Sequence, residues 1–184
     1  MIKCIRKLHK KNNKLIKKFC KKLLTSIHDE EWQNKISQMS KMKFYRQFKH
    51  QPKLSKYLSL VQYRPHRQAL TRILISAHKL KIETSRYSQH KKLHTNNRIC
   101  DFCEQSLNLI DDEMHFIFDC THNQQERTLT FNFMGIFNTT SLGNEEKIEI
   151  LRNILENEKQ ENEMKQFAKF IYQSEQKRLE NVRK

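Results

Sequence analysis

The sequence predicts a mainly α-helical protein, and two observations carry this prediction. The 184 residues include only two glycines and two prolines, so the tight turns that a many-stranded sheet needs would be scarce. Apolar residues also recur three and four positions apart along several segments, which is the spacing of one helix face. Because only 36% of the residues are hydrophobic and the mean hydropathy is −0.88, we expect the helices to share a thin core.

Two basic helices are predicted near the N-terminus. Residues 5–24 place apolar side chains on one face and lysines around the rest. Residues 29–49 form the second predicted helix, and Pro52 interrupts the chain after it. The apolar face of the first helix consists of Ile5, Leu8, Leu15, Phe19 and Leu23.

A third helix is predicted to begin at Pro65, because proline is favoured at the first helical position, where its missing N–H is not needed. Residues 83–98 lack apolar periodicity, so we expect a loop there. The apolar residues that repeat at helical spacing after Pro65 are Leu70, Ile73, Leu74, Ala77 and Leu80.

Two more helices are predicted at the C-terminal end. Asn144 can cap the first of them, with Glu145 and Glu146 in its opening turn. The last helix covers residues 163–180. The apolar residues expected to be buried are Ile148, Leu151 and Leu155 in the first helix and Phe167, Phe170 and Ile171 in the second.

Charge is distributed unevenly along the chain. Residues 1–100 carry 26 Lys and Arg against 4 Asp and Glu, a net charge of +22. Residues 101–184 carry 10 against 16, a net charge of −6. A basic block of this density is typical of proteins that bind polyanions, nucleic acid first among them. The alternative is a lysine-rich surface that only keeps the chain solvated.

Four metal-ligand side chains lie within 21 residues of sequence. Cys100 and Cys103 form C-x2-C, and His115 and Cys120 form H-x4-C after an eleven-residue loop. Three thiolates and one imidazole suit tetrahedral zinc, and a closed four-ligand site is usually structural. We expect Arg98, just before the first ligand, to help offset the negative charge of the thiolates.

Other interpretations of this segment remain open. Buried thiols in a helical core, beside a hydrogen-bonded histidine, would place the same residues together without a metal. His94 and His122 are further candidate ligands, with His122 the better placed to support the site from just after Cys120. Neither improves on the Cys-Cys-His-Cys set.

No catalytic motif is complete in this sequence. His28 to Glu30 supply the H-x-E of a zinc deaminase, but the later P-C-x2-C lacks its proline, because Ile99 precedes Cys100. Two glycines, at positions 135 and 143, cannot build a Gly-rich phosphate loop. The acidic run 111–113 is more typical of a helix cap than of a catalytic acid cluster. We therefore expect no enzymatic activity and no catalytic residues.

The sequence divides into three predicted parts: a basic helical arm at 1–50, a helix with a zinc-binding module at 51–135, and acidic helices at 136–184. The predicted fold is thus a helical domain with a small zinc-stabilised Cys-Cys-His-Cys insert. The sequence contains no run of 18 apolar residues, so no membrane span is predicted. The N-terminal "MIKCIRKLHKK" lacks the apolar core of a signal peptide. Five cysteines without such a signal favour a reducing intracellular location, nuclear or cytoplasmic.

The order of several motifs resembles the C-terminal region of non-LTR retrotransposon reverse transcriptases. "LTRILISAHKLKIETSRY" is followed by "RICDFC" and "DDEMHFIFDC", where that family has a leucine-rich helix, H-x-L-x-I-E-x-G-R-Y, C-x2-C, E-D-E-x-H-F and a last cysteine. The resemblance covers roughly residues 32–180. Upstream it includes Tyr45, Phe48, Tyr57 and Leu58. The positions that match the H-x-L-x-I-E motif are His78, Leu80, Ile82, Glu83, Arg86 and Tyr87.

The resemblance implies a zinc-binding region that follows a polymerase and helps to hold RNA or DNA, with Cys100, Cys103, His115 and Cys120 in the ligand places. The chain departs from the pattern at Ser85, where glycine is usual, and at Thr121, where proline often follows the last cysteine. It also has no Y-x-D-D-like aspartate pair and no room for a polymerase palm.

From these observations we expect a non-catalytic module that binds Zn²⁺ and, through its basic half, RNA or DNA. Tyr87 could stack on an unpaired base or pack in the core. The alternatives are a zinc-stabilised module that binds a protein partner through its C-terminal helices, and a membrane-surface or calmodulin-type role for the N-terminal helix. The candidate nucleic-acid contacts are Arg64, Arg67, Arg72, Lys79, Arg86, Tyr87 and Arg98.

Overall fold

A computed structural model describes residues 2–87, 94–137, 139–157 and 161–182. Helices account for most of these residues, and no β-strand occurs among them, so the predicted mainly α fold is confirmed. The nearest approach to a sheet in the described part is one isolated antiparallel bridge between Ile99 and Ile110. None of the helices described is sufficiently long and apolar to cross a bilayer.

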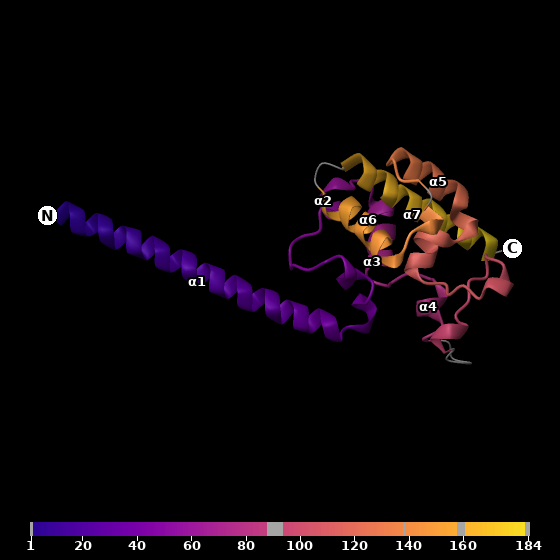
Figure 1. Cartoon of the computed structure of the whole chain (residues 1–184), viewed down its shortest axis with the longest axis horizontal. Coiled ribbons are helices and arrows are strands. Elements are labelled where there is room, and N and C mark those ends of the chain that lie inside the picture. Colours follow the sequence, from indigo (N-terminus) through magenta and orange to yellow (C-terminus); the bar gives the residue numbers. More distant parts are fainter. Residues whose placement is uncertain (1, 88–93, 138, 158–160, 183–184) are drawn as a thin grey trace.

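The N-terminal segment is one long helix, α1 (Ile2–Gln38), which projects from the rest of the molecule (Figure 1). The sequence predicted two helices, at 5–24 and 29–49, and this prediction was wrong. The structure has no break between them, and the helix ends at Gln38. Residues 1–51 contain neither glycine nor proline, so nothing interrupts the helix between the two segments. The extended backbone of Met39 ends it, and two 3₁₀ turns follow, Ser40–Met42 and Tyr45–Gln47.

The last turns of α1 attach it to the body. Ile36 is buried, and the Arg46 guanidinium donates to the carbonyl oxygen of Ser37 at 2.6 Å. The Gln33 amide donates to the carbonyl oxygen of His50. Since the side chains from residue 13 to residue 28 are exposed, the contact with the body lies at the C-terminal end of the helix.

The centre of the body is α7 (Glu161–Val182), which contacts α2 (Tyr57–Leu60), α3 (Arg64–Leu74), α5 (Gln124–Phe133) and α6 (Asn144–Glu156) (Figure 1). The predicted burial of Phe167, Phe170 and Ile171 is confirmed. The same core includes residues from Phe44 to Ile171, so all three predicted parts of the chain contribute to it. The boundaries proposed between those parts stay a prediction.

Helix α3 has proline in its first turn, as predicted, but ends sooner than its apolar pattern suggested. Ile75 leaves the helical conformation, and Ser76 adopts the left-handed region with φ of 50°. Ala77 is therefore exposed, and Leu80 is buried outside α3, just before the short helix α4 (Lys81–Thr84). The left-handed turn matters because it aims the next side chains at the metal-ligand segment.

Helix α6 begins one residue earlier than the predicted cap at Asn144 implies. Gly143 occupies the N-cap position and Asn144 is the first helical residue. The Gly143 N–H donates to the Glu146 carboxylate at 2.7 Å, so the acidic first turn does stabilise the helix start. Of the predicted stripe, Leu151 and Leu155 are buried and Ile148 is half-buried.

Candidate metal centre

The four predicted ligands converge from two short segments of the chain. Cys100 and Cys103 lie on the turn that follows the Ile99–Ile110 bridge. His115 opens a single π-helical turn, His115–Asp119, and Cys120 ends it. The Cys120 N–H donates to the carbonyl oxygen of His115 at 2.8 Å, which holds the second pair of ligands together.

The ligand atoms have the spacing of a tetrahedral metal site. The Cys120 sulfur lies 3.9 Å from the Cys100 sulfur and 3.8 Å from the Cys103 sulfur. The Cys103 sulfur lies 3.4 Å from His115 Nε2, and all four ligand atoms are within 4.8 Å of one another. A tetrahedron with metal–sulfur bonds of about 2.3 Å has sulfur–sulfur edges of about 3.8 Å and sulfur–nitrogen edges of about 3.6 Å.

These four side chains are all buried, and their sulfurs are too far apart for a disulfide, which needs about 2.05 Å. Within the described residues they are the one group of three or more metal-ligand side chains that could hold an ion. The group does not include His94 or His122. His122 instead lies against the Phe102 ring, with ring centroids 4.6 Å apart.

The acidic run before His115 has three separate roles. Asp112 accepts the His115 N–H at 2.8 Å, which is the capping contact that the sequence predicted. Asp111 accepts the Lys81 N–H at 2.9 Å and an Arg178 guanidinium N–H at 2.8 Å. Glu113 accepts the Ser76 hydroxyl at 2.5 Å. Each carboxylate thus fixes a different chain segment around the ligands.

Arg178, on α7, is the most important residue that sequence reasoning missed. Its guanidinium donates to the Cys120 sulfur at 3.0 Å and to the Cys100 sulfur at 3.7 Å. The guanidinium carbon also lies 4.9 Å from the Phe102 ring centroid and 4.8 Å from that of Phe116. Arg98, which the sequence suggested for charge compensation, is buried and donates to the carbonyl oxygen of Ile82 at 2.6 Å.

Cys100 and Cys120, whose sulfurs Arg178 contacts, also contact each other, and their pKa values shift in opposite directions. The hydrogen bond from the Cys100 thiol lowers the pKa of Cys120, and contacts with His115 and Arg178 lower it as well. Together these contacts outweigh burial, which raises the pKa of Cys120. The same thiol–thiolate contact, together with burial, raises the pKa of Cys100. The arrangement thus favours a thiolate at Cys120 even before a cation is considered.

Side chains from other segments bind the backbone of the ligands. The Arg127 guanidinium on α5 donates to the carbonyl oxygen of Cys120 at 2.7 Å and is itself buried. The Gln105 amide donates to the carbonyl oxygen of Cys100 at 2.9 Å. These contacts fix the backbone of both ligand pairs, so the ligand geometry does not depend on the thiol–thiol contacts alone.

A buried polar cluster joins the end of α3 to the metal-ligand segment. His78 Nε2 and the Ser76 hydroxyl both contact the same oxygen of Glu113, at 2.9 Å and 2.5 Å. Burial raises the pKa of Glu113, but the contacts with His78 and Ser76 outweigh it, so the pKa is lowered overall. Because the serine bonds the carboxylate and not the imidazole, the cluster lacks the serine–histidine contact that a hydrolytic triad requires.

The candidate nucleic-acid contacts differ widely in exposure. Arg64, Lys79 and Tyr87 are exposed, and the Lys41 ammonium lies 5.4 Å from the Tyr87 ring centroid. Arg98 is buried. The remaining three make internal contacts: Arg67 with the carbonyl oxygen of Val61 at 2.9 Å, Arg72 with Glu175 at 2.6 Å, and Arg86 with Glu83 at 3.2 Å.

Two of these candidates meet at a cavity beside the metal-ligand group. Arg72 and Lys79 line a cavity of about 610 Å³ whose wall also includes Phe102 and Arg178. The cavity lies between α3, α4, α7 and the C-x2-C turn. A polyanion that contacts Lys79 would therefore lie close to the metal-ligand group.

No protein-family model, curated protein or solved structure matches the chain. Its own residues form a buried group of three cysteines and one histidine that can hold a metal ion, built into a helical body.

Proposed function

We propose that the chain is a zinc-binding and nucleic-acid-binding module without catalytic activity of its own, derived from the C-terminal region of a non-LTR retrotransposon reverse transcriptase. The observation that carries the proposal is the tetrahedral spacing of Cys100, Cys103, His115 and Cys120. Since all four positions of the tetrahedron are taken by protein atoms, no open position is left for water or substrate. The site therefore serves the fold and not a reaction.

Zinc is the ion that this ligand set suits best. Three thiolates and an imidazole are soft or borderline ligands in tetrahedral arrangement, whereas magnesium and calcium require oxygen ligands in larger numbers. Three thiolates leave a zinc site negatively charged, and the Arg178 guanidinium lies where it offsets that charge. A bound dication would also displace the proton with which the Cys100 thiol contacts Cys120.

The zinc proposal is tested by metal analysis of the purified chain. Mass spectrometry under native conditions, after purification without chelator, should find one zinc per chain. A metal-to-protein ratio near zero, with helical content unchanged by chelation, would contradict it.

Nucleic-acid binding is supported by the charge of the first 100 residues, a net +22, and by the exposure of Arg64 and Lys79. The lysines of α1 from residue 14 to residue 22 are exposed as well. Electrostatic contacts with phosphates need exposed cations and no particular fold, so these residues meet the requirement. The cavity beside Lys79 would bring the bound strand close to the zinc module.

A salt titration tests this part of the proposal. Fluorescence anisotropy with a labelled single-stranded oligonucleotide should give a log–log slope of affinity against salt of roughly −4 for six phosphate contacts. Absence of binding at low salt, or affinity that does not change as salt rises, would contradict the electrostatic mechanism. Duplex DNA and duplex RNA in the same assay would show which nucleic acid is preferred.

The proposed origin is supported by contacts between separate motif segments. His78, from the H-x-L-x-I-E-like segment, contacts Glu113, from the D-D-E-x-H-F segment, at 2.9 Å. The side chains that carry the resemblance thus meet next to the ligands. A polymerase reading frame directly upstream of Met1 in the genome would support the origin, and an unrelated upstream gene would count against it.

A protein-interaction module is a second candidate, and one observation favours it. Leu129 and Phe133 lie one turn apart on α5 and are 68% and 57% exposed, and Phe137 nearby is 65% exposed. An apolar surface of this kind is more typical of a protein contact than of a phosphate contact. The candidate surface is thus α5 and not α6 and α7, whose apolar residues are largely buried in the core.

A further inference from the structure

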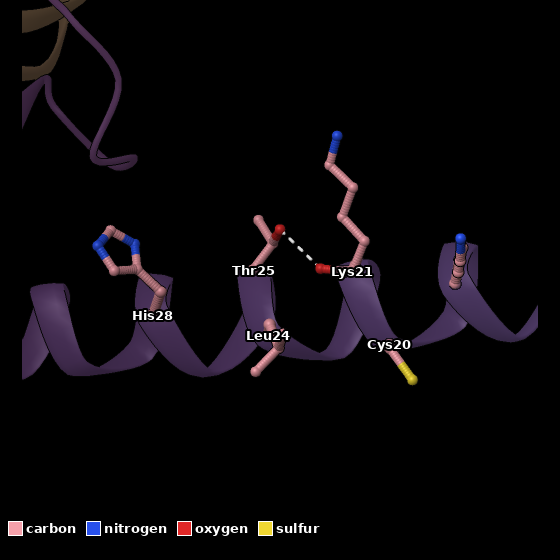
Figure 2. Close-up of a pocket in the computed structure, with 6 residues that line it drawn as sticks. Cys20, Lys21, Leu24, Thr25 and His28 are labelled. Atoms are coloured by element: carbon pink, nitrogen blue, oxygen red, sulfur yellow. Dashed lines mark hydrogen bonds between the residues drawn. The ribbon is translucent and has the colours of Figure 1, made fainter.

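The exposed face of α1 is apolar as well as basic, which phosphate contacts do not explain. Six large apolar side chains between residues 15 and 27 are between 46% and 68% exposed. In Figure 2, Cys20 and Leu24 point to one side of the helix and Lys21 points to the other. The six exposed side chains are Leu15, Ile16, Phe19, Leu23, Leu24 and Ile27.

The opposite face of the helix carries only positive charge. Residues 1–28 contain ten Lys and Arg and no Asp or Glu. Within the part of α1 whose side chains are described, Lys14, Lys17, Lys18, Lys21 and Lys22 are all exposed. At about 100° per residue, the six apolar residues occupy a sector of about 180°, and all of these lysines lie outside it. About half of the helix circumference is therefore apolar and the remainder is basic.

We propose that α1 binds the surface of a membrane that contains anionic phospholipids. The helix would lie in the plane of the interface, with Phe19 and its apolar neighbours among the acyl chains and the lysines at the anionic headgroups. A strongly amphipathic helix with lysines on its polar face and Leu and Phe on the other has the properties of such interfacial helices. Five lysines between residues 14 and 22 suit the interface and not a span of the bilayer.

Charge complementarity favours an anionic membrane surface over a second copy of the chain as the partner of α1. In a pair of α1 helices, the apolar faces would be flanked by lysines from both copies, with no acidic residue before Asp29 to pair with them. A helix that binds in a protein groove inserts apolar side chains from a narrow stripe, spaced three and four residues apart. The apolar sector of α1 is about 180° wide, which is broader than such a stripe. Nucleic acid would use the lysines and leave the apolar sector in water.

Vesicle co-sedimentation of the full zinc-loaded chain tests the proposal. Binding to vesicles of phosphatidylcholine with phosphatidylserine should be strong, and binding to phosphatidylcholine alone should be weak. The double variant Phe19→Ser/Leu23→Ser should lower the vesicle partition coefficient at least about tenfold, because it removes apolar area that would be buried. The double variant Lys17→Gln/Lys21→Gln should lower it about 25-fold, since each lysine contributes about fivefold near an anionic surface.

The matched control is Leu129→Ser/Phe133→Ser on α5, which removes two apolar side chains of similar exposure from the body. This control should leave vesicle binding unchanged. All variants should keep their zinc, which shows that the body is folded. As a direct reporter, Phe19→Trp in a Trp32→Phe background should show a blue-shifted emission with phosphatidylserine vesicles, since Trp32 is the single tryptophan.

Several outcomes would overturn the proposal. The absence of binding to phosphatidylserine vesicles would do so directly. Binding that falls with the lysine variant but not with Phe19→Ser/Leu23→Ser would show simple electrostatic adsorption, the behaviour expected for nucleic acid. A dimer in sedimentation equilibrium that Phe19→Ser/Leu23→Ser dissociates would assign the apolar face to a second copy. Lack of vesicle binding together with tight capture by an acidic calmodulin-type protein would assign it to a protein groove.

Discussion

The body around the metal centre and the α1 arm use charge in opposite ways. In the body, cations are buried beside the groups that they neutralise: Arg178 contacts two sulfurs and Asp111, and Lys147 contacts Asp119 at 2.8 Å. In the arm, lysines from residue 14 to residue 22 face water. The same formal charge therefore stabilises the fold in one region and is available to a partner in the other.

This difference has a thermodynamic consequence. Removing one partner of a buried charge contact leaves the other in a medium that solvates it poorly, which is costly. Removing an exposed lysine changes little in the folded protein. Substitutions of buried cations should therefore act on stability, and substitutions of exposed cations, most of all those of the arm, should act on binding.

Metal removal should give the largest effect. The substitution Cys120→Ser should abolish zinc binding and the cooperative thermal unfolding of the body, because structural zinc contributes about 10 kcal/mol or more and small domains are stable by about 5–15 kcal/mol. Zinc content and differential scanning calorimetry measure the effect. Cys20→Ser, at an exposed position on the arm, is the control and should change neither. An unchanged unfolding transition in Cys120→Ser would show that the ligand group does not support the fold.

The second prediction concerns Arg178. We expect Arg178→Met to lower the free energy of unfolding by about 3–5 kcal/mol, because Asp111 and two sulfurs lose the cation that they contact. Loss of such an outer contact should also weaken zinc binding about 10- to 100-fold, as competition with a chelator would measure. The neighbouring Lys177→Met, which removes a partly exposed pair with Glu126, should cost at most about 1 kcal/mol. Equal effects of the two variants would contradict the role assigned to Arg178.

The contrast between Arg178 and the ligands also shows what the sequence could predict. The ligands were predictable because C-x2-C and H-x4-C are local patterns with few alternatives. Arg178 follows Cys120 by 58 residues, and arginine in a long polar helix has no local feature that indicates a buried contact. Only the packing of α7 against the body places it at the sulfurs.

The helices show the same division between local and non-local information. The first turn of α3 and the buried face of α7 were predicted because proline placement and apolar spacing are local. The end of α3 was not predicted, because Ser76 in its left-handed conformation is held by Glu113, 37 residues further along the chain. The continuity of α1 should have been predicted, since residues 1–51 contain no glycine or proline.

A third prediction compares one substitution in the two regions. Phe167→Ala should destabilise the body by about 3–4 kcal/mol, because the ring is fully buried and its removal leaves a cavity. Phe19→Ala should change the free energy of unfolding by less than about 0.5 kcal/mol, since Phe19 is 68% exposed on the arm. Urea unfolding followed by circular dichroism measures both. A large loss of stability in Phe19→Ala would mean that the arm packs against the body.

The smallest expected effect is a change in the salt dependence of oligonucleotide binding. It should differ between Lys79 and Arg98, two cations that the sequence could not distinguish. Lys79 is exposed beside the cavity, whereas Arg98 is buried and donates to the carbonyl oxygen of Ile82. Lys79→Ala should make the salt dependence of oligonucleotide binding less steep by about 0.7, the loss of one contact with a single strand, and should leave stability unchanged. Arg98→Ala should keep the slope and lower stability by about 1–3 kcal/mol, because a carbonyl inside the fold loses its donor. Anisotropy titrations at several salt concentrations, paired with urea unfolding, measure both quantities. The reverse result, with the slope changed by Arg98→Ala and not by Lys79→Ala, would show that exposure does not decide which cations meet the nucleic acid.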